Sequence, residues 1–93
     1  CPLGPWIVDR INPAGVEIQL LVNNEIRQNS NTSHMIFPVD YLVSFISQVM
    51  TLLPGDVIMT GTPSGVGPIK PGDNIMIRIN GVGNLSNTVI NGA

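Results

Sequence analysis

Residues 16–28 read Val16-Glu17-Ile18-Gln19-Leu20-Leu21-Val22-Asn23-Asn24-Glu25-Ile26-Arg27-Gln28. Apolar side chains at the even positions from 16 to 22 alternate with Glu17 and Gln19, which is typical of a strand with one buried face. Asparagine tolerates the positive φ that a two-residue hairpin turn requires, so Asn23-Asn24 predicts such a turn. Residues 25–28 are therefore expected to pair back on the first strand.

One helix is predicted on the C-terminal side of this hairpin, over residues 38–52. Asp40 lies in its first turn, where the helix dipole favours a carboxylate, and Leu53-Pro54-Gly55 ends the element. Apolar side chains recur three and four positions apart, which places them on one face of the helix. We expect this stripe to be core or interface, and its members are Leu42, Phe45, Ile46, Val49 and Met50.

The chain after the helix is predicted to be β structure again. We expect a short buried strand over residues 57–60, an alternating strand over residues 74–79, and a hairpin turn at Asn80-Gly81 into a final strand from about residue 85 to 90. Pro-Gly-Asp precedes two of these strands, at residues 54–56 and 71–73, and predicts two turns of similar chemistry. The predicted fold class is mixed and β-rich (α+β), with one main helix.

Composition narrows the classes of function. The chain has 93 residues, and its 4 Lys and Arg against 6 Asp and Glu are too few cations to bind a phosphate backbone, so nucleic acid is not an expected partner. A single Cys forms no internal disulfide, and no apolar run approaches the ~20 residues of a membrane span, so we expect a reducing cytoplasm and no membrane association.

The low charge also predicts that the chain is part of something larger. Only 11% of its residues are charged, whereas a free-standing domain has about a quarter, so some faces are expected to be covered. The chain also begins at Cys1 without an initiator Met. We therefore expect a fragment of a longer protein.

The most unusual segment is Thr60-Gly61-Thr62-Pro63-Ser64-Gly65-Val66-Gly67-Pro68. Its glycines and short hydroxyl side chains follow a predicted strand, where backbone amides could approach an anionic ligand without side-chain bulk. It is not a P-loop, because Lys70 lies beyond Pro68, nor a dinucleotide loop, because no helical pattern follows. Two interpretations stay open: a tight connection between strands, and a loop that cradles a ligand.

Other candidate residues give weaker signals. Gly81-Val82-Gly83 is interpreted as a hairpin turn, since it lies between two predicted strands. His34 has no partner at metal-ligand spacing and is expected to be a solvated or hydrogen-bonded loop histidine. Cys1 lacks an identifiable histidine partner for a nucleophile. Arg27-Gln28 is either an exposed strand end or a fork that binds carboxylates. The acidic residues are isolated from one another, so no cage for a hard cation is visible.

Five motifs in chain order carry a resemblance to a known family, and they lie at residues 1–8, 21–28, 31–37, 53–67 and 70–73. Together they resemble the C-terminal half of the catalytic domain of the fumarylacetoacetate hydrolase family, and the Thr-Gly-Thr-Pro-Ser-Gly-Val-Gly run is the most specific of them. The similarity is to the prokaryotic branch that includes acylpyruvate hydrolases, oxaloacetate decarboxylases and 2-hydroxyhepta-2,4-diene-1,7-dioate isomerase. It implies that residues 1–93 are the C-terminal portion of one catalytic domain.

This resemblance implies a rolled β-sheet fold, usually dimeric, that holds Mg²⁺ or Mn²⁺ over a 2-oxo acid or acylpyruvate substrate. In the family the metal polarises the 2-oxo and carboxylate oxygens, and an enolate forms as a C–C bond breaks or a proton moves. The family's loop that matches Gly61-Thr62 places a threonine hydroxyl and backbone amides on a substrate carboxylate. Gly61 and Thr62 are therefore the predicted substrate-binding residues.

The chain also departs from the family pattern. The family's metal ligands, a Glu-x-Glu pair and an Asp, belong upstream of Cys1, as do its Lys and its acid/base His-Glu pair. No metal ligand and no catalytic residue is therefore predicted here, and this chain alone is expected to be inactive. Asn24 replaces a common Gly, a change that asparagine tolerates.

Two hypotheses follow. In the first, the chain completes an enzyme with its N-terminal half and a second copy as partners, and the sequence does not separate hydrolysis, decarboxylation and isomerisation. In the second, it is a non-catalytic β-rich binding or assembly module, or an inactive fragment, whose apolar helix stripe docks on a partner chain.

Overall fold

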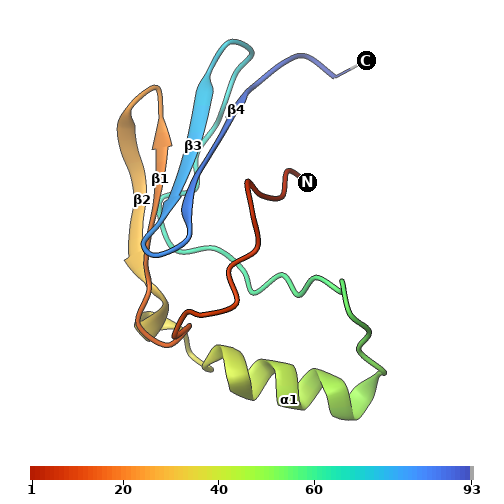
Figure 1. Ribbon diagram of the computed structural model, residues 1–93. Helices are drawn as coiled ribbons and strands as arrows, with labels where there is room; N and C mark the ends of the chain where they lie inside the picture. Colours follow the sequence, from red (N-terminus) through yellow and green to blue (C-terminus); the bar gives the residue numbers. More distant parts are fainter. Residues whose placement is uncertain (93) are drawn as a thin grey trace.

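The computed structural model of this chain describes residues 1–92 and forms one four-stranded antiparallel sheet with a helix beyond one end of it (Figure 1). Residue 93, the last of the predicted domain, lies outside the described residues. The order across the sheet is β2-β1-β3-β4. The elements are β1 (Glu17–Val22), β2 (Glu25–Asn31), the 3₁₀ helix η1 (Thr32–His34), α1 (Val39–Val49), β3 (Asn74–Ile79) and β4 (Gly83–Thr88). The predicted mixed, β-rich class with one main helix is confirmed.

The β1–β2 hairpin turns at the predicted residues. Asn23 has φ 51° and Asn24 has φ 66°, so both adopt the left-handed conformation that a tight hairpin turn needs. The second hairpin also forms where it was expected, between β3 and β4, with Gly81 at φ 80°. Its strand β4 ends at Thr88, two residues before the predicted end.

A β-bulge interrupts the first hairpin. Leu21 lies opposite Ile26, but the next residue of β1, Leu20, lies opposite Gln28 and leaves Arg27 unpaired. Opposite residues of an antiparallel pair share a face of the sheet, so Gln28 lies on the apolar face with Leu20. A regular hairpin would have carried Gln28 to the polar face.

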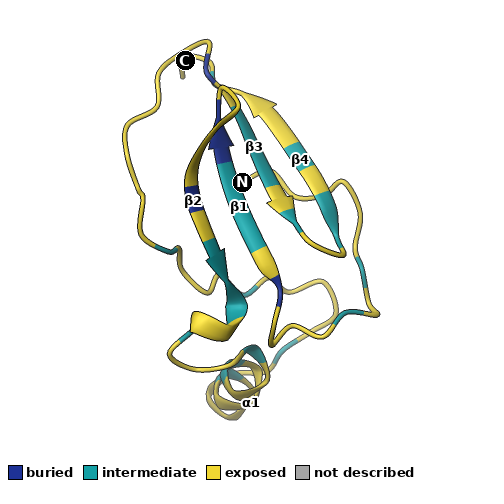
Figure 2. Cartoon of the chain, turned by 90° about the vertical axis from the view of Figure 1, so that its left-hand side faces the viewer, coloured by how far each residue is buried: buried dark blue, intermediate teal, exposed yellow. Residues whose placement is uncertain are grey.

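Burial is concentrated in the hairpin, as Figure 2 shows. The buried hydrophobic side chains of the described chain are Val16, Leu21 and Val22, and the buried polar ones are Gln28 and Asp73. Many large apolar side chains elsewhere are exposed, which is unusual for a surface that contacts only solvent. This agrees with the low charge of the sequence.

Helix α1 carries much of this exposed apolar surface. Phe37, Tyr41 and Phe45 stack in succession along one side, with ring centroids 5.1 and 6.5 Å apart, and each is at least half exposed. Leu42 and Ile46 of the predicted stripe are half-buried. The stripe does not form a core within residues 1–92.

The prediction of a strand over residues 57–60 is wrong. Val57 is 61% exposed, Met59 is 82% exposed, and the segment joins no strand ladder among the described residues. A short apolar run becomes a strand only where it lies along an open strand edge, and residues 57–60 pair with neither of the two edge strands, β2 and β4. The run is therefore an irregular segment on the path from α1 to the loop of residues 60–68.

The two Pro-Gly-Asp turns do share one chemistry, as predicted. The Leu53 amide donates to the Asp56 carboxylate (2.8 Å) and the Asp56 amide donates back to the Leu53 carbonyl (3.1 Å). Lys70 and Asp73 repeat this exchange at 3.0 and 3.1 Å, and the glycine of each turn has φ 92°. Each turn is thus closed by its aspartate.

Asp73 differs from Asp56 because it also joins the turn to the hairpin. Its second carboxylate oxygen accepts from Asn23 Nδ2 (3.0 Å), and Asn23 Oδ1 accepts from the Asn74 amide (2.9 Å). Hydrogen bonds from the Lys70 backbone amide and then from Asn23 lower the pKa of this carboxyl below its usual 3.8.

Because the pKa of Asp73 is lowered by folding, its contribution to stability is present above the ordinary pKa of 3.8 and is lost as the pH falls through the lowered value. Asp73→Asn in the whole protein is expected to reduce the Tm at about pH 7 and to flatten the loss of Tm on acidification. Thermal unfolding across this pH range is the measurement, with the exposed Asp56→Asn as the matched control. Equal Tm profiles for the two variants would contradict the prediction.

Candidate functional site

The loop of residues 60–68 borders a cavity of about 570 Å³ beyond the end of the sheet. Residues 60–64 form one wall, the adjoining ends of β1 and β2 with η1 form another, and residues 35–37 and Leu42 close the side next to α1. No acidic side chain is among the described residues that line it. Hydroxyl, amide and backbone groups therefore dominate its polar lining.

Gly61 and Thr62 both lie on this cavity and are exposed to it. Gly61 has φ 96°, a conformation that residues with a Cβ adopt only under strain, so the glycine allows the loop to turn here. The Thr62 hydroxyl accepts a hydrogen bond from Gln28 Nε2 at 2.9 Å. The structure thus places both predicted site residues at one cavity, with the threonine held from behind by the sheet.

Gln28 is the residue that anchors the loop to the sheet. Its side chain is 9% exposed, and Nε2 donates both to Thr62 Oγ1 and to the Pro63 carbonyl at 2.8 Å. The neighbouring Arg27 carbonyl lies so close to Gly65 that a Cβ at Gly65 would be 2.1 Å from its oxygen. The bulge therefore brings two consecutive residues of β2 against the loop.

Sequence reasoning did not find this role for Gln28. Arg27-Gln28 was interpreted as an exposed strand end or a carboxylate fork, and the structure divides the pair. Arg27 is exposed, whereas Gln28 is buried and binds the chain's own loop. The bulge carries no local sequence signal, so the pattern of residues 16–28 could not reveal it.

His34 lies at the same cavity, exposed at the end of the 3₁₀ helix η1. Its Nδ1 is 3.3 Å from Ser30 Oγ, so the expected hydrogen bond is confirmed, but the residue ends a short helix and does not lie in a loop. Cys1 is exposed and free. Among the described residues, no hydrogen bond links His34 or Cys1 to Thr62, so neither is positioned to act with it as a nucleophile or base.

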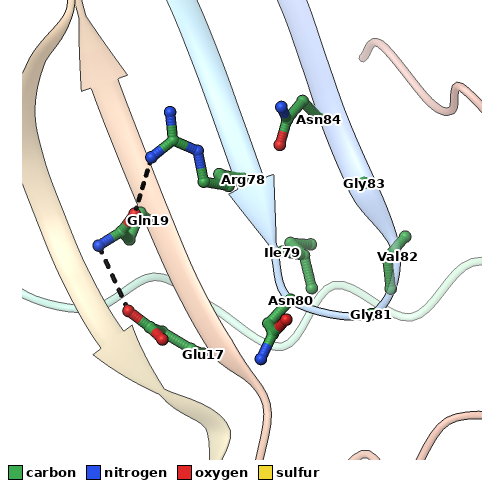
Figure 3. A pocket seen from close by; sticks show the side chains of 9 residues that line it. All are labelled: Glu17, Gln19, Arg78, Ile79, Asn80, Gly81, Val82, Gly83 and Asn84. Atoms are coloured by element: carbon green, nitrogen blue, oxygen red, sulfur yellow. Dashed lines mark hydrogen bonds between the residues drawn. The ribbon is translucent and has the colours of Figure 1, made fainter.

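A second hollow of about 510 Å³ lies at the β3–β4 turn (Figure 3). There Gln19 Nε2 donates to Glu17 (3.3 Å) and Arg78 donates to Gln19 Oε1 (3.4 Å), so the long polar side chains bind one another. Neither Gly61 nor Thr62 lines it, and Glu17 and Gln19 face away from Ile18, which lines the first cavity. We take the cavity at the loop as the candidate site.

The described residues do not fit a metal site. Within residues 1–92 no three His, Cys, Asp or Glu side chains lie close enough together to hold a metal ion. Mg²⁺ and Mn²⁺ prefer oxygen ligands that include carboxylates, which the cavity lacks. In the part of the chain that the structure describes, no helix has the length and apolar character to cross a membrane.

Comparisons with solved structures match the fold closely. The structure of 2-hydroxyhepta-2,4-diene-1,7-dioate isomerase from Mycobacterium marinum has a TM-score of 0.93 and 53% identity, and it covers 97% of this chain and 36% of that one. Maleylpyruvate hydrolase from Sphingobium sp. SYK-6, solved in complex with manganese(II) and pyruvate, has a TM-score of 0.95 and 43% identity over 100% of this chain and 36% of that one.

Curated relatives include the 4-hydroxyphenylacetate degradation bifunctional isomerase/decarboxylase of Salmonella dublin, which is 44% identical over 96% of this chain and 21% of its own length. The chain thus spans about a third or less of the length of these relatives. Residues 1–90 match the family described as Fumarylacetoacetate (FAA) hydrolase C-terminal. A match over nearly the whole chain, with the same fold, shows that the chain belongs to the fumarylacetoacetate hydrolase family.

Proposed function

We propose that the whole protein is a metal-dependent enzyme that acts on 2-oxo or β-diketo acids, such as acylpyruvates, through an enolate. Relatives in the family are isomerases, hydrolases and decarboxylases. In this proposal hydrolysis, decarboxylation and isomerisation share the enolate. In this proposal residues 1–93 are the C-terminal portion of a single catalytic domain. The observation that carries it is a donor-rich loop, anchored by a buried glutamine, at a cavity without acidic side chains.

Gly61 and Thr62 bind the substrate carboxylate in this proposal. A hydroxyl donor and the exposed backbone of a glycine-rich turn are suited to an anion, because hydrogen bonds to charged acceptors are stronger than neutral ones. The lack of acidic side chains at the cavity removes the repulsion that would oppose a carboxylate. The other end of the substrate would face groups outside this chain.

The divalent metal, Mg²⁺ or Mn²⁺, is proposed to have its ligands outside residues 1–93. When bound, such an ion polarises the substrate oxygens as a Lewis acid. The residues of this chain orient the carboxylate and exclude water from that side of the substrate. The exposed aromatic side of α1 supports a homodimer or a contact with the rest of the protein. The single Cys, which forms no internal disulfide, supports a reducing cytoplasm as the location.

The experiment is an activity screen of the whole protein with Mn²⁺ or Mg²⁺ supplied in parallel. Substrates are an acylpyruvate, oxaloacetate and 2-hydroxyhepta-2,4-diene-1,7-dioate, and pyruvate is tested as a competitive ligand. We expect turnover of at least one substrate and competition by pyruvate. Absence of turnover and of pyruvate binding under every condition would contradict the proposal. That result would favour the non-catalytic assembly module, which the exposed apolar face of α1 also supports.

A further inference from the structure

A single side-chain nitrogen holds the loop at two points. The Pro63 carbonyl can only accept a hydrogen bond, so the Gln28 atom 2.8 Å from it is the NH₂ nitrogen and not the amide oxygen. That nitrogen carries two hydrogens, and its other partner is Thr62 Oγ1 at 2.9 Å. Both hydrogens of Gln28 are therefore used, and the Thr62 hydroxyl is the acceptor of the second.

This arrangement decides what the hydroxyl can offer to the cavity. A threonine hydroxyl has one hydrogen to donate and lone pairs that accept, and it rotates to suit its partners. With Gln28 donating to it, the Thr62 hydrogen is left for an acceptor. No other partner of Thr62 Oγ1 is found in the described chain, so a ligand carboxylate is the acceptor that the cavity lining favours.

We infer that Gln28 is a positioning residue that fixes the Thr62 hydroxyl as a hydrogen-bond donor toward the ligand and so makes this part of the site selective for a carboxylate. The inference rests on the proposed role of Thr62 in binding the substrate carboxylate. It adds a reason for that preference. A ligand group that can only donate, such as an amide NH₂, would face the hydrogen of the Thr62 hydroxyl and could not accept from it.

The surroundings of Gln28 hold this polarity in place. Its side chain is 9% exposed. Rotation of the amide by 180° would place its oxygen against the Pro63 carbonyl oxygen and leave the buried NH₂ group without these partners, which is costly. The bulge at Arg27 directs Gln28 to the face of the sheet on which the loop packs. The absence of a side chain at Gly65 allows the loop to lie directly against the Arg27 carbonyl of β2.

The test uses the whole protein with its metal and compares binding of pyruvate with binding of pyruvamide, in which an NH₂ group replaces a carboxylate oxygen. Gln28→Met keeps the length of the side chain but removes both donors. We expect it to weaken pyruvate binding about five- to tenfold, the value of one net hydrogen bond, and to change pyruvamide binding by less than about twofold. Gln48→Met, at an exposed position of α1, is the matched control and is expected to bind both ligands as the wild type does.

The same substitution is then made in the Thr62→Val background, where Gln28 has no hydroxyl to orient. There Gln28→Met is expected to have no further effect on pyruvate binding, because positioning acts through Thr62. If Gln28 had only a general structural role, Gln28→Met would weaken the binding of both ligands equally, or would weaken pyruvate binding in the wild-type and the Thr62→Val backgrounds alike. Either result overturns the inference.

Two further outcomes separate this inference from the proposed function. If Thr62→Val weakens pyruvate binding and Gln28→Met does not, the positioning role is overturned and the proposed function stands. If Thr62→Val itself binds pyruvate as the wild type does, both are overturned. Should Gln28→Met fail to fold, Gln28→Glu gives the same comparison, because its carboxylate would accept the Thr62 hydrogen and the loss should again be larger for pyruvate than for pyruvamide.

Discussion

Thr62→Val in the whole protein is expected to weaken binding of a 2-oxo acid substrate roughly 10- to 150-fold. Valine has the shape of threonine, so the cavity keeps its form while the hydroxyl is lost. A hydrogen bond to a charged group contributes about 1.5–3 kcal/mol, which corresponds to that range of affinity. The value of kcat/KM and the dissociation constant of pyruvate are the quantities to measure.

Two control variants test whether the loss is due to the Thr62 hydroxyl. Thr62→Ser retains a hydroxyl and is expected to stay within a few-fold of the wild type, because Gln28 can still donate to it. Thr51→Val changes an exposed threonine that does not line the cavity and should have no effect. Wild-type kcat/KM for Thr62→Val would show that the loop does not bind the substrate carboxylate.

Gly65→Ala is expected to displace the loop from the sheet and to destabilise the protein by roughly 2–5 kcal/mol. A Cβ at this position would lie 2.1 Å from the Arg27 carbonyl oxygen and 3.1 Å from Gln28 Cγ, and the backbone has φ 104°. Arg27 is held between Ile26 and Gln28, which are both paired with β1, so its carbonyl cannot move away cheaply and the loop must move. Chemical denaturation measures the stability, and pyruvate binding reports whether Thr62 has left its place.

Substitutions of two other glycines distinguish the steric clash from the backbone strain. Gly55→Ala has the same kind of positive φ, 92°, but its Cβ would meet no heavy atom within 4 Å, so it reports backbone strain alone. Gly15→Ala has neither feature and should be near neutral. Gly65→Ala is expected to exceed both losses of stability, and wild-type stability together with wild-type pyruvate binding would refute the close packing of loop and strand.

Locally encoded features of the fold could be predicted from the sequence. The Asn23-Asn24 turn, the two Pro-Gly-Asp turns and the alternating strand of residues 74–79 each depend on a few adjacent residues, and each lies where it was expected. The loop of residues 60–68 was singled out by its composition and its motif, and it does border a cavity.

Features that depend on distant partners could not be predicted in the same way. The strand expected at residues 57–60 required pairing with a strand far away in the sequence, and the segment pairs with neither edge strand of the sheet, β2 or β4. Gln28 gained its role only because the loop containing Thr62, 34 residues further along the chain, packs against a bulge in β2. A polar residue at the end of a hairpin looks the same in sequence whether it faces water or anchors a site.

The bulge at Arg27 makes the length of the hairpin more important than the identity of the bulged residue. Removing Arg27 would leave Gln28 opposite Leu20 in a regular hairpin, whereas adding one residue between the Asn23-Asn24 turn and Gln28 would move Gln28 opposite Gln19, on the other face of the sheet. Exchange of Arg27 for another residue would leave the spacing intact. Over the evolution of this hairpin, substitutions at position 27 should therefore be tolerated far more readily than insertions between the turn and Gln28.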